Sequence, residues 1–233
     1  KDQPPACKTT YSWMSKKNQY QRIYDILNLH YGPQHWWPAD SPFEVMIGAV
    51  LVQNTTWKNT STAIASLKQA GLMSPSAIYK TSNDYLASLI VSSGYFNIKA
   101  KRLRALCEWL VEHGDIEQLK RLPLESIRKD LLAVHGIGPE TADDILLYAL
   151  DKPVFVIDAY TRRLFSRLGL VKHDAAYEEL RTVFEQALEK DVSLYNQYHA
   201  LIVVHGKNIC MTRPLCQLCC LNEQCYKKGL GDK

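Results

Sequence analysis

The chain has 233 residues, 46% hydrophobic residues and a formal net charge of +4 at pH 7. This length can bury a substantial core, and the apolar share is ordinary for a globular protein. No run of about 18 apolar residues predicts a membrane span, and residues 1–17 lack the apolar segment of a secretory signal. We therefore expect a cytoplasmic protein, nucleoid-associated if prokaryotic, whose charge is compatible with a polyanionic partner.

Hydrophobic periodicity predicts helices almost throughout the chain. The first covers residues 16–32 and stops before Pro33. Ser41 is the expected N-cap of a second helix over residues 42–55, whose nearly continuous apolar stretch predicts burial. Residues 153–157 resemble a strand, but their isolation favours an extended connector. Further helices are predicted at 58–70, 83–92, 97–113, 124–134, 139–150, 159–168, 174–190 and 192–208.

Residues 131–150, LLAVHGIGPETADDILLYAL, predict a helix, a tight turn at Gly136 and Gly138, and a second helix. The free N–H groups at the start of that second helix favour an anion such as a phosphate. An ordinary helix–turn–helix corner is equally compatible with two glycines. The following VFVIDAYTRR adds a carboxylate, Asp158, after an apolar run.

Five of the seven cysteines lie close together near the C-terminus, whereas Cys7 and Cys107 stand alone. A disulfide knot, a structural zinc site and a four-thiolate iron–sulfur cluster are the alternatives. The wide gaps on either side of a central C-x2-C favour the iron–sulfur cluster. The five are Cys210, Cys216, Cys219, Cys220 and Cys225.

Six segments in order resemble the helix-hairpin-helix DNA glycosylases of the endonuclease III superfamily. They are GAVLVQNTTWKN, SGYFNIKAKRL, VHGIGPETAD, VIDAYTRR, HGKNIC and the cysteine cluster. The resemblance implies an all-α, two-lobed endonuclease III-like fold with a helix-hairpin-helix motif and an iron–sulfur cluster loop. It places a six-helix barrel at residues 42–155 and the cluster lobe at residues 1–41 plus 156–233. It also implies a monomer that binds double-stranded DNA containing a damaged base.

The resemblance assigns a [4Fe–4S] cluster to Cys210, Cys216, Cys219 and Cys225. The first two of these enclose five residues where the family pattern has six. This shorter loop leaves Cys220 as an alternative ligand.

By the same resemblance, Asp158 is the catalytic carboxylate, which stabilises positive charge at C1′ and orients or deprotonates the attacking water. Asp158 also suits the N-cap of the next helix. Family members that cut the strand carry a lysine where this chain has Glu140, because an amine must form the Schiff base. The sequence therefore predicts a monofunctional glycosylase. Glu140 could equally be a solvated acid in the first turn of its helix.

The aromatic residues around the second helix suggest a base pocket, although packing would also explain some of them. Electron-rich indoles favour an electron-poor or cationic ring, such as an N-alkylated purine. Together with Glu140, this arrangement resembles the 3-methyladenine DNA glycosylase branch of the superfamily, although members of that branch often lack the iron–sulfur cluster loop that this chain carries. The expected pocket residues are Trp36, Trp37, Trp57, Glu140 and Lys207. By the same resemblance, the expected DNA contacts are Gln53, Tyr95, Gly136, Gly138, Thr141 and Arg162, with Arg163, Lys99 and Lys101 as further phosphate contacts.

Two other functions fit the same residues. One is a monofunctional glycosylase for uracil, mismatched thymine or an oxidised pyrimidine. The other is a non-catalytic DNA damage-binding module.

Overall fold

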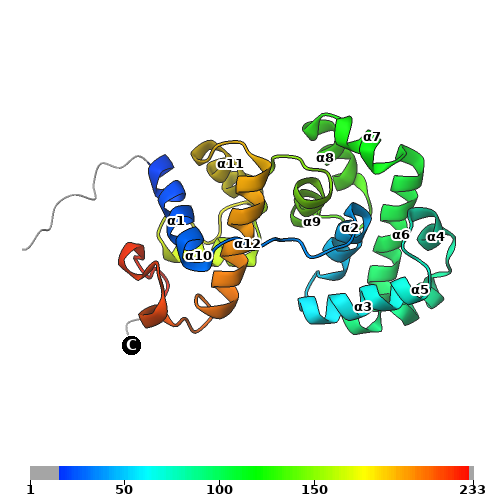
Figure 1. Ribbon diagram of the computed structural model, residues 1–233, viewed down its shortest axis with the longest axis horizontal. Helices are drawn as coiled ribbons and strands as arrows, with labels where there is room; N and C mark the ends of the chain where they lie inside the picture. The colour runs from blue at the N-terminus through cyan, green and yellow to red at the C-terminus, as the bar shows by residue number, and fades with distance from the viewer. Residues whose placement is uncertain (1–15, 231–233) are drawn as a thin grey trace, which may run out of the picture. The chain divides into compact units, whose positions relative to one another are not determined.

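The computed structural model describes residues 16–230, and within them every regular element is helical (Figure 1). Residues 1–15, which include Cys7, and residues 231–233 lie outside the described part of the predicted cluster lobe. The chain divides by contacts into two compact units, which we name by their place in the sequence. The central unit comprises His35–Asp158 and Lys190–His199. The terminal unit comprises Lys1–Gln34, Ala159–Glu189 and Ala200–Lys233.

The central unit begins with α2 (Pro42–Leu51) and α3 (Trp57–Gln69). The short helices α4 (Pro75–Lys80) and α5 (Asn83–Leu89) and a 3-10 turn at Val91–Ser93 lead into the long α6 (Phe96–His113). The remaining helices of its main segment are α7 (Ile116–Arg121), α8 (Leu124–Ala133) and α9 (Pro139–Asp144), which continues as the π-helical segment η2 (Ile145–Ala149).

The terminal unit contains α1 (Lys16–Tyr31), α10 (Ala159–Arg167) and α11 (Tyr177–Ala187). Two 3-10 turns follow, η3 (Cys216–Leu218) and η4 (Asn222–Gln224). Helix α12 (Val192–Asn208) supplies its first residues to the central unit and the rest to the terminal unit. The terminal unit packs around the mutually contacting rings of Tyr20, Phe165 and Phe184, whose centroids lie 4.6–5.3 Å apart.

Helix α2 confirms the prediction of a capped, buried helix. The Glu44 amide donates to Ser41 Oγ at 3.2 Å, and all residues from Phe43 to Leu51 are buried. The helix contacts η2, α3, α6 and α9. At its end, Lys99 Nζ donates to Leu51 O at 2.8 Å and to Ser93 O at 2.6 Å. Lys99 is 1% exposed, so the prediction that it contacts phosphates is wrong.

The other helices lie close to their predicted ranges, with two additions. Helices α4 and α7 have six residues each and bury one apolar side chain each, Ile78 and Leu119. So few residues give no readable helical period. The predicted 42–55 helix ends at Leu51, before a turn in which Asn54 has φ +55°. Residues 153–157 form the predicted extended connector. No helix among residues 16–230 is long and apolar enough to cross a membrane.

Candidate active site and cysteine cluster

The hairpin between α8 and α9 holds a glutamine side chain in place. Gly136 has φ +83°, and a Cβ there would lie 2.3 Å from Arg102 Cγ, so glycine is required. Gln53 Nε2 donates to Thr141 Oγ1 at 2.8 Å and approaches Gly136 O at 3.4 Å. The Arg102 guanidinium donates to Gln53 Oε1. Gln53, Gly136 and Thr141, three of the predicted DNA contacts, therefore meet at one place.

A buried ion pair joins the two hairpin helices. Arg128 of α8 donates to both carboxylate oxygens of Asp143 of α9, at 2.7 and 3.1 Å. The Asp143 side chain is 0% exposed and that of Arg128 is 9% exposed. Such a two-point contact fixes the angle between guanidinium and carboxylate as well as their distance. It therefore fixes α9 against α8.

Asp158 follows the fully buried run Val154–Ile157, and its side chain is 11% exposed. Its Oδ2 lies 3.6 Å from His199 Nε2, and His199 Nδ1 lies 2.6 Å from the Tyr148 hydroxyl. Burial, together with Asp144 and Asp158, raises the pKa of Tyr148 well above its usual value, so the phenol keeps its proton. If this proton is donated to Nδ1, a neutral His199 carries its own proton on Nε2, facing Asp158.

Glu140, Asp144 and Tyr148 recur every four residues along α9 and η2, which places them on one face. The Glu140 side chain is exposed by area, yet burial and then the charge of Asp158 raise its pKa to about 7. Both observations fit a residue whose surface reaches solvent while many protein atoms surround its carboxyl group and reduce its hydration. Asp144 is 6% exposed, and burial, followed by the charges of Glu140 and Asp158, raises its pKa well above the usual range.

Trp37 lies at the centre of the predicted aromatic pocket. Its ring makes edge-to-face contacts with Trp57 at 5.4 Å and with Tyr148 at 5.3 Å, and Trp36 lies 6.2 Å away. A Cβ on Gly48 of α2 would lie 3.3 Å from Trp37 Nε1, so the small residue allows the ring to approach the buried helix. All three tryptophans are half-buried. The contacts run without a break from Trp57 through Trp37, Tyr148 and His199 to Asp158.

The other predicted contact residues are placed differently. Tyr95 is 67% exposed and has φ +47° at the start of α6, and Gly138 is exposed before α9. Lys101 and Lys207 are exposed, the latter in the terminal unit. Arg162, also in the terminal unit, donates to the carbonyls of His173 and Ala175. This gives Arg162 a structural partner, and its contact with phosphate stays a prediction.

Four of the clustered cysteines share one small cavity of the terminal unit. Cys210, Cys216, Cys219 and Cys225 all line it, whereas Cys220 does not. The cysteines of residues 16–230 are all free thiols. Among the same residues, no three His, Cys, Asp or Glu side chains converge at the geometry of a single metal ion. The shared cavity groups the four cysteines that the resemblance assigned and leaves Cys220 out, and their role as cluster ligands stays a prediction.

Helix α10 organises the chain leading into this cavity. Arg167 donates to Cys210 Sγ at 3.3 Å and to the carbonyls of Met211 and Thr212 at 2.6 and 3.1 Å. Arg163 donates to the carbonyls of Gly206 and Cys210, both at 2.8 Å. Arg167 thereby holds the Cys210 sulfur and the two carbonyls that follow it in one arrangement. Arg163 therefore has a structural position rather than the predicted free phosphate-binding one.

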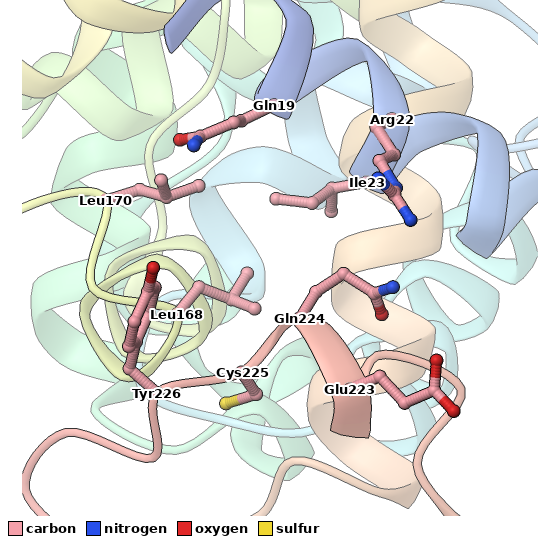
Figure 2. A pocket seen from close by; sticks show the side chains of 9 residues that line it. All are labelled: Gln19, Arg22, Ile23, Leu168, Leu170, Glu223, Gln224, Cys225 and Tyr226. Carbon is pink, nitrogen blue, oxygen red and sulfur yellow. The ribbon is translucent and has the colours of Figure 1, made fainter. Parts of the chain in front are cut away.

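His205 and a second cavity adjoin the cysteines. His205 Nε2 lies 3.4 Å from Cys219 Sγ, and its Nδ1 lies 2.9 Å from the Tyr31 hydroxyl. Burial lowers the pKa of His205 to about 4, so its ring is neutral. A second cavity, of about 260 Å³, lies between α1 and residues 223–226 (Figure 2). Ile23, Leu168 and Cys225 are among its lining residues, so Cys225 borders both cavities.

Comparison with known proteins identifies the family. Residues 47–190 match the HhH-GPD superfamily of base excision DNA repair proteins, and the chain belongs to this family of DNA glycosylases. The Methanocaldococcus jannaschii protein MJ1434 is 44% identical to this chain, over 91% of this chain and the full length of MJ1434. Its name describes it as a candidate DNA repair glycosylase. The resemblance to the endonuclease III superfamily is thereby confirmed.

Two solved structures share the fold. H. pylori 3-methyladenine DNA glycosylase (MagIII) bound to 1,N6-ethenoadenine has a TM-score of 0.71 and 29% identity, over 83% of this chain and 98% of that chain. A non-covalent endonuclease III–DNA complex has a TM-score of 0.78 and 22% identity, over 92% of this chain and 97% of that chain. The predicted all-α endonuclease III-like fold is confirmed.

Sequence analysis missed Asp144, Tyr148 and His199. Each lies in an apolar helical stretch, where a polar residue looks like an interruption of the core. The available signal was the spacing of Glu140, Asp144 and Tyr148, which puts three polar side chains on one face of a helix that is otherwise buried.

Proposed function

We propose that this protein is a monofunctional DNA glycosylase that hydrolyses the N-glycosidic bond of an alkylated purine, such as 3-methyladenine, flipped out of double-stranded DNA. The observation that carries the proposal is Glu140 beside Asp158, where a strand-cutting glycosylase would need a lysine amine. A carboxylate cannot form a Schiff base with C1′. We therefore infer that the product is an intact abasic strand.

In this reaction a water molecule attacks C1′ as the bond from C1′ to the base nitrogen breaks, and the base leaves with the bonding electrons. A purine alkylated at N3 or N7, as in 3-methyladenine, carries a positive charge, so it leaves as a neutral base. Asp158 stabilises the positive charge that develops on the sugar and accepts the proton of the water. His199, held by Tyr148, faces this carboxylate at 3.6 Å and is suited to orient it.

Lys99 has the lowered pKa of a Schiff-base amine, but it is buried away from solvent. Burial, followed by the charge of Arg102, lowers the pKa of Lys99 to about 8. Lysines that act as nucleophiles are shifted in this direction. However, Lys99 is 1% exposed and both of its hydrogen bonds go to backbone carbonyls at helix ends. These contacts support a structural role, and therefore the hydrolytic proposal.

The choice of an alkylated purine rests on the aromatic cluster around Trp37. Half-buried indole rings attract a cationic ring by about 0.5–2 kcal/mol per contact. The MagIII structure is described as bound to 1,N6-ethenoadenine, an alkylated adenine. Pocket roles for Trp36, Trp57, Glu140 and Lys207 are part of the same proposal.

We further propose that Cys210, Cys216, Cys219 and Cys225 hold a [4Fe–4S] cluster. The four thiols share one cavity, and Arg167 donates a hydrogen bond to Cys210 Sγ at 3.3 Å. When bound, the cluster would cross-link the loop from Cys210 to Cys225. Gln53, Tyr95, the Gly136–Thr141 hairpin and Arg162 are proposed to contact the DNA, which a monomer would bind.

The test is base release from duplexes carrying 3-methyladenine, 7-methylguanine, hypoxanthine, uracil or thymine opposite guanine, with strand cleavage scored before and after alkali. We expect release of an alkylated purine, cleavage only after alkali, and a loss of at least about a hundredfold in Asp158→Asn. Release of a pyrimidine would instead support the uracil or thymine alternative. Strand cleavage without alkali would overturn the monofunctional proposal. Binding without release would indicate a damage-binding module.

A further inference from the structure

Asp144 is a buried acid that the proposed reaction leaves without a role. It is 6% exposed, and its Oδ1 has no hydrogen-bond partner among residues 16–230. Its neighbour in sequence, Asp143, is also buried but is fully engaged by Arg128. A buried polar atom without a partner is costly and rare in folded proteins, and it calls for a specific explanation.

The surroundings of Asp144 connect it to the candidate active site. Glu140 lies one helical turn before it and Tyr148 one turn after it, on the same face. The charges of Glu140, Asp158 and Asp143 all disfavour the charged form of the Asp144 carboxyl. Three acidic neighbours and burial all favour the neutral acid over the carboxylate. Asp144 therefore presents an O–H donor and a carbonyl acceptor side by side.

A neutral carboxyl has the same pair of hydrogen-bonding groups as the amide of asparagine. An asparagine amide reads the N6 donor and N7 acceptor of adenine by two hydrogen bonds. The base flipped toward Asp158 must meet polar groups that read its edge. In this part of the central unit, Tyr148 is already engaged with His199, whereas Asp144 Oδ1 has no hydrogen-bond partner.

Resting on the proposed function, we propose that Asp144 is a base-recognition residue: its buried, unpartnered Oδ1 and the second oxygen of the same carboxyl pair with adjacent donor and acceptor groups on the edge of the extruded purine. The ligand class is a purine that keeps an N–H donor beside a ring acceptor, as 3-methyladenine does at N6 and N7. 1,N6-ethenoadenine has lost that donor, because the etheno bridge occupies N6. Asp144 therefore favours the first base over the second.

The experiment compares the full chain with Asp144→Val and Asp144→Asn in single-turnover release of 3-methyladenine and of 1,N6-ethenoadenine. One bidentate pair corresponds to about a tenfold to hundredfold discrimination. We expect Asp144→Val to lose release of 3-methyladenine by this factor and release of ethenoadenine by much less. Asp144→Asn, which keeps donor and acceptor, should stay within about threefold of the wild type on both bases. Equal losses on the two bases, or equal impairment of both variants, would overturn the proposal.

Two further measurements separate recognition from folding and from catalysis. Because valine removes a buried acid that lacks a partner, Asp144→Val should melt at the wild-type temperature or above it. Asp143→Asn, which weakens a satisfied ion pair, should melt lower and leave the ratio of the two release rates unchanged. If the wild type releases neither base, the proposed function fails. Quenching of tryptophan fluorescence by free 3-methyladenine then tests Asp144 alone, and equal quenching in wild type and Asp144→Val would refute its role.

Discussion

The titration of Glu140 is coupled to folding. An unfolded glutamate titrates near pH 4.3, whereas burial and Asp158 raise the pKa of Glu140 to about 7. Between these values the folded chain binds more protons than the unfolded chain, so stability falls as pH rises. We expect the drop in melting temperature from about pH 5 to about pH 8 to be smaller in Glu140→Gln than in the wild type. Glu125→Gln, an exposed first-turn acid of α8, is the control. Parallel curves for Glu140→Gln and wild type would contradict this coupling.

Single residues were predictable where a motif fixed them and not where the tertiary structure did. Asp158 and Glu140 stand at fixed offsets from the glycine turn, and the resemblance to the family assigned their roles. Lys99 looks like its exposed neighbour Lys101 in sequence, but helix α6 turns it inward to the carbonyl of Leu51. Its burial depends on the position of α2, which no local pattern encodes.

At the scale of elements, the Arg128–Asp143 pair fixes the hairpin. Removing one partner of a buried ion pair leaves an uncompensated charge and costs about 3–5 kcal/mol. We expect Asp143→Ala to lower the free energy of unfolding by this amount, measured by urea denaturation. Asp84→Ala, an exposed first-turn acid of α5, should cost less than about 1 kcal/mol. A loss as small as that of the control would mean that the pair does not fix α9 against α8.

The π-helical segment η2 shows a limit of periodicity. The sequence predicts one regular helix over residues 139–150. From Ile145, however, the backbone hydrogen bonds span five residues instead of four, and Leu150 N donates to Ile145 O at 3.1 Å. A π-helical turn is wider than an α-helical one, but over only five residues it changes the spacing of apolar residues too little to be seen in the sequence. Such segments are frequent at functional sites, and this one carries Tyr148 to His199 and Trp37.

At the scale of the whole molecule, the terminal unit is built from segments far apart in the chain. Neither composition nor a linker marks its boundaries, because α10 and α11 follow the central unit without a polar or glycine-rich spacer. Its core forms only when Tyr20 of α1 meets Phe165 and Phe184, over 140 residues later. The division into lobes at residues 42–155 stays a prediction that rests on the resemblance.

The ligand set of the proposed cluster is testable on the whole chain. Thiolate ligands of a bound cluster would cross-link the loop from Cys210 to Cys225, and metal binding of this kind is coupled to folding. We expect Cys225→Ser to lose iron and visible absorption and to melt at a lower temperature. Cys220→Ser, the matched control outside the shared cavity, should keep four irons per chain and the wild-type melting temperature. Loss of iron in Cys220→Ser together with its retention in Cys216→Ser would reverse the assignment. Zinc in place of iron, in protein purified without air, would reject the cluster and leave the four cysteines as a structural zinc site.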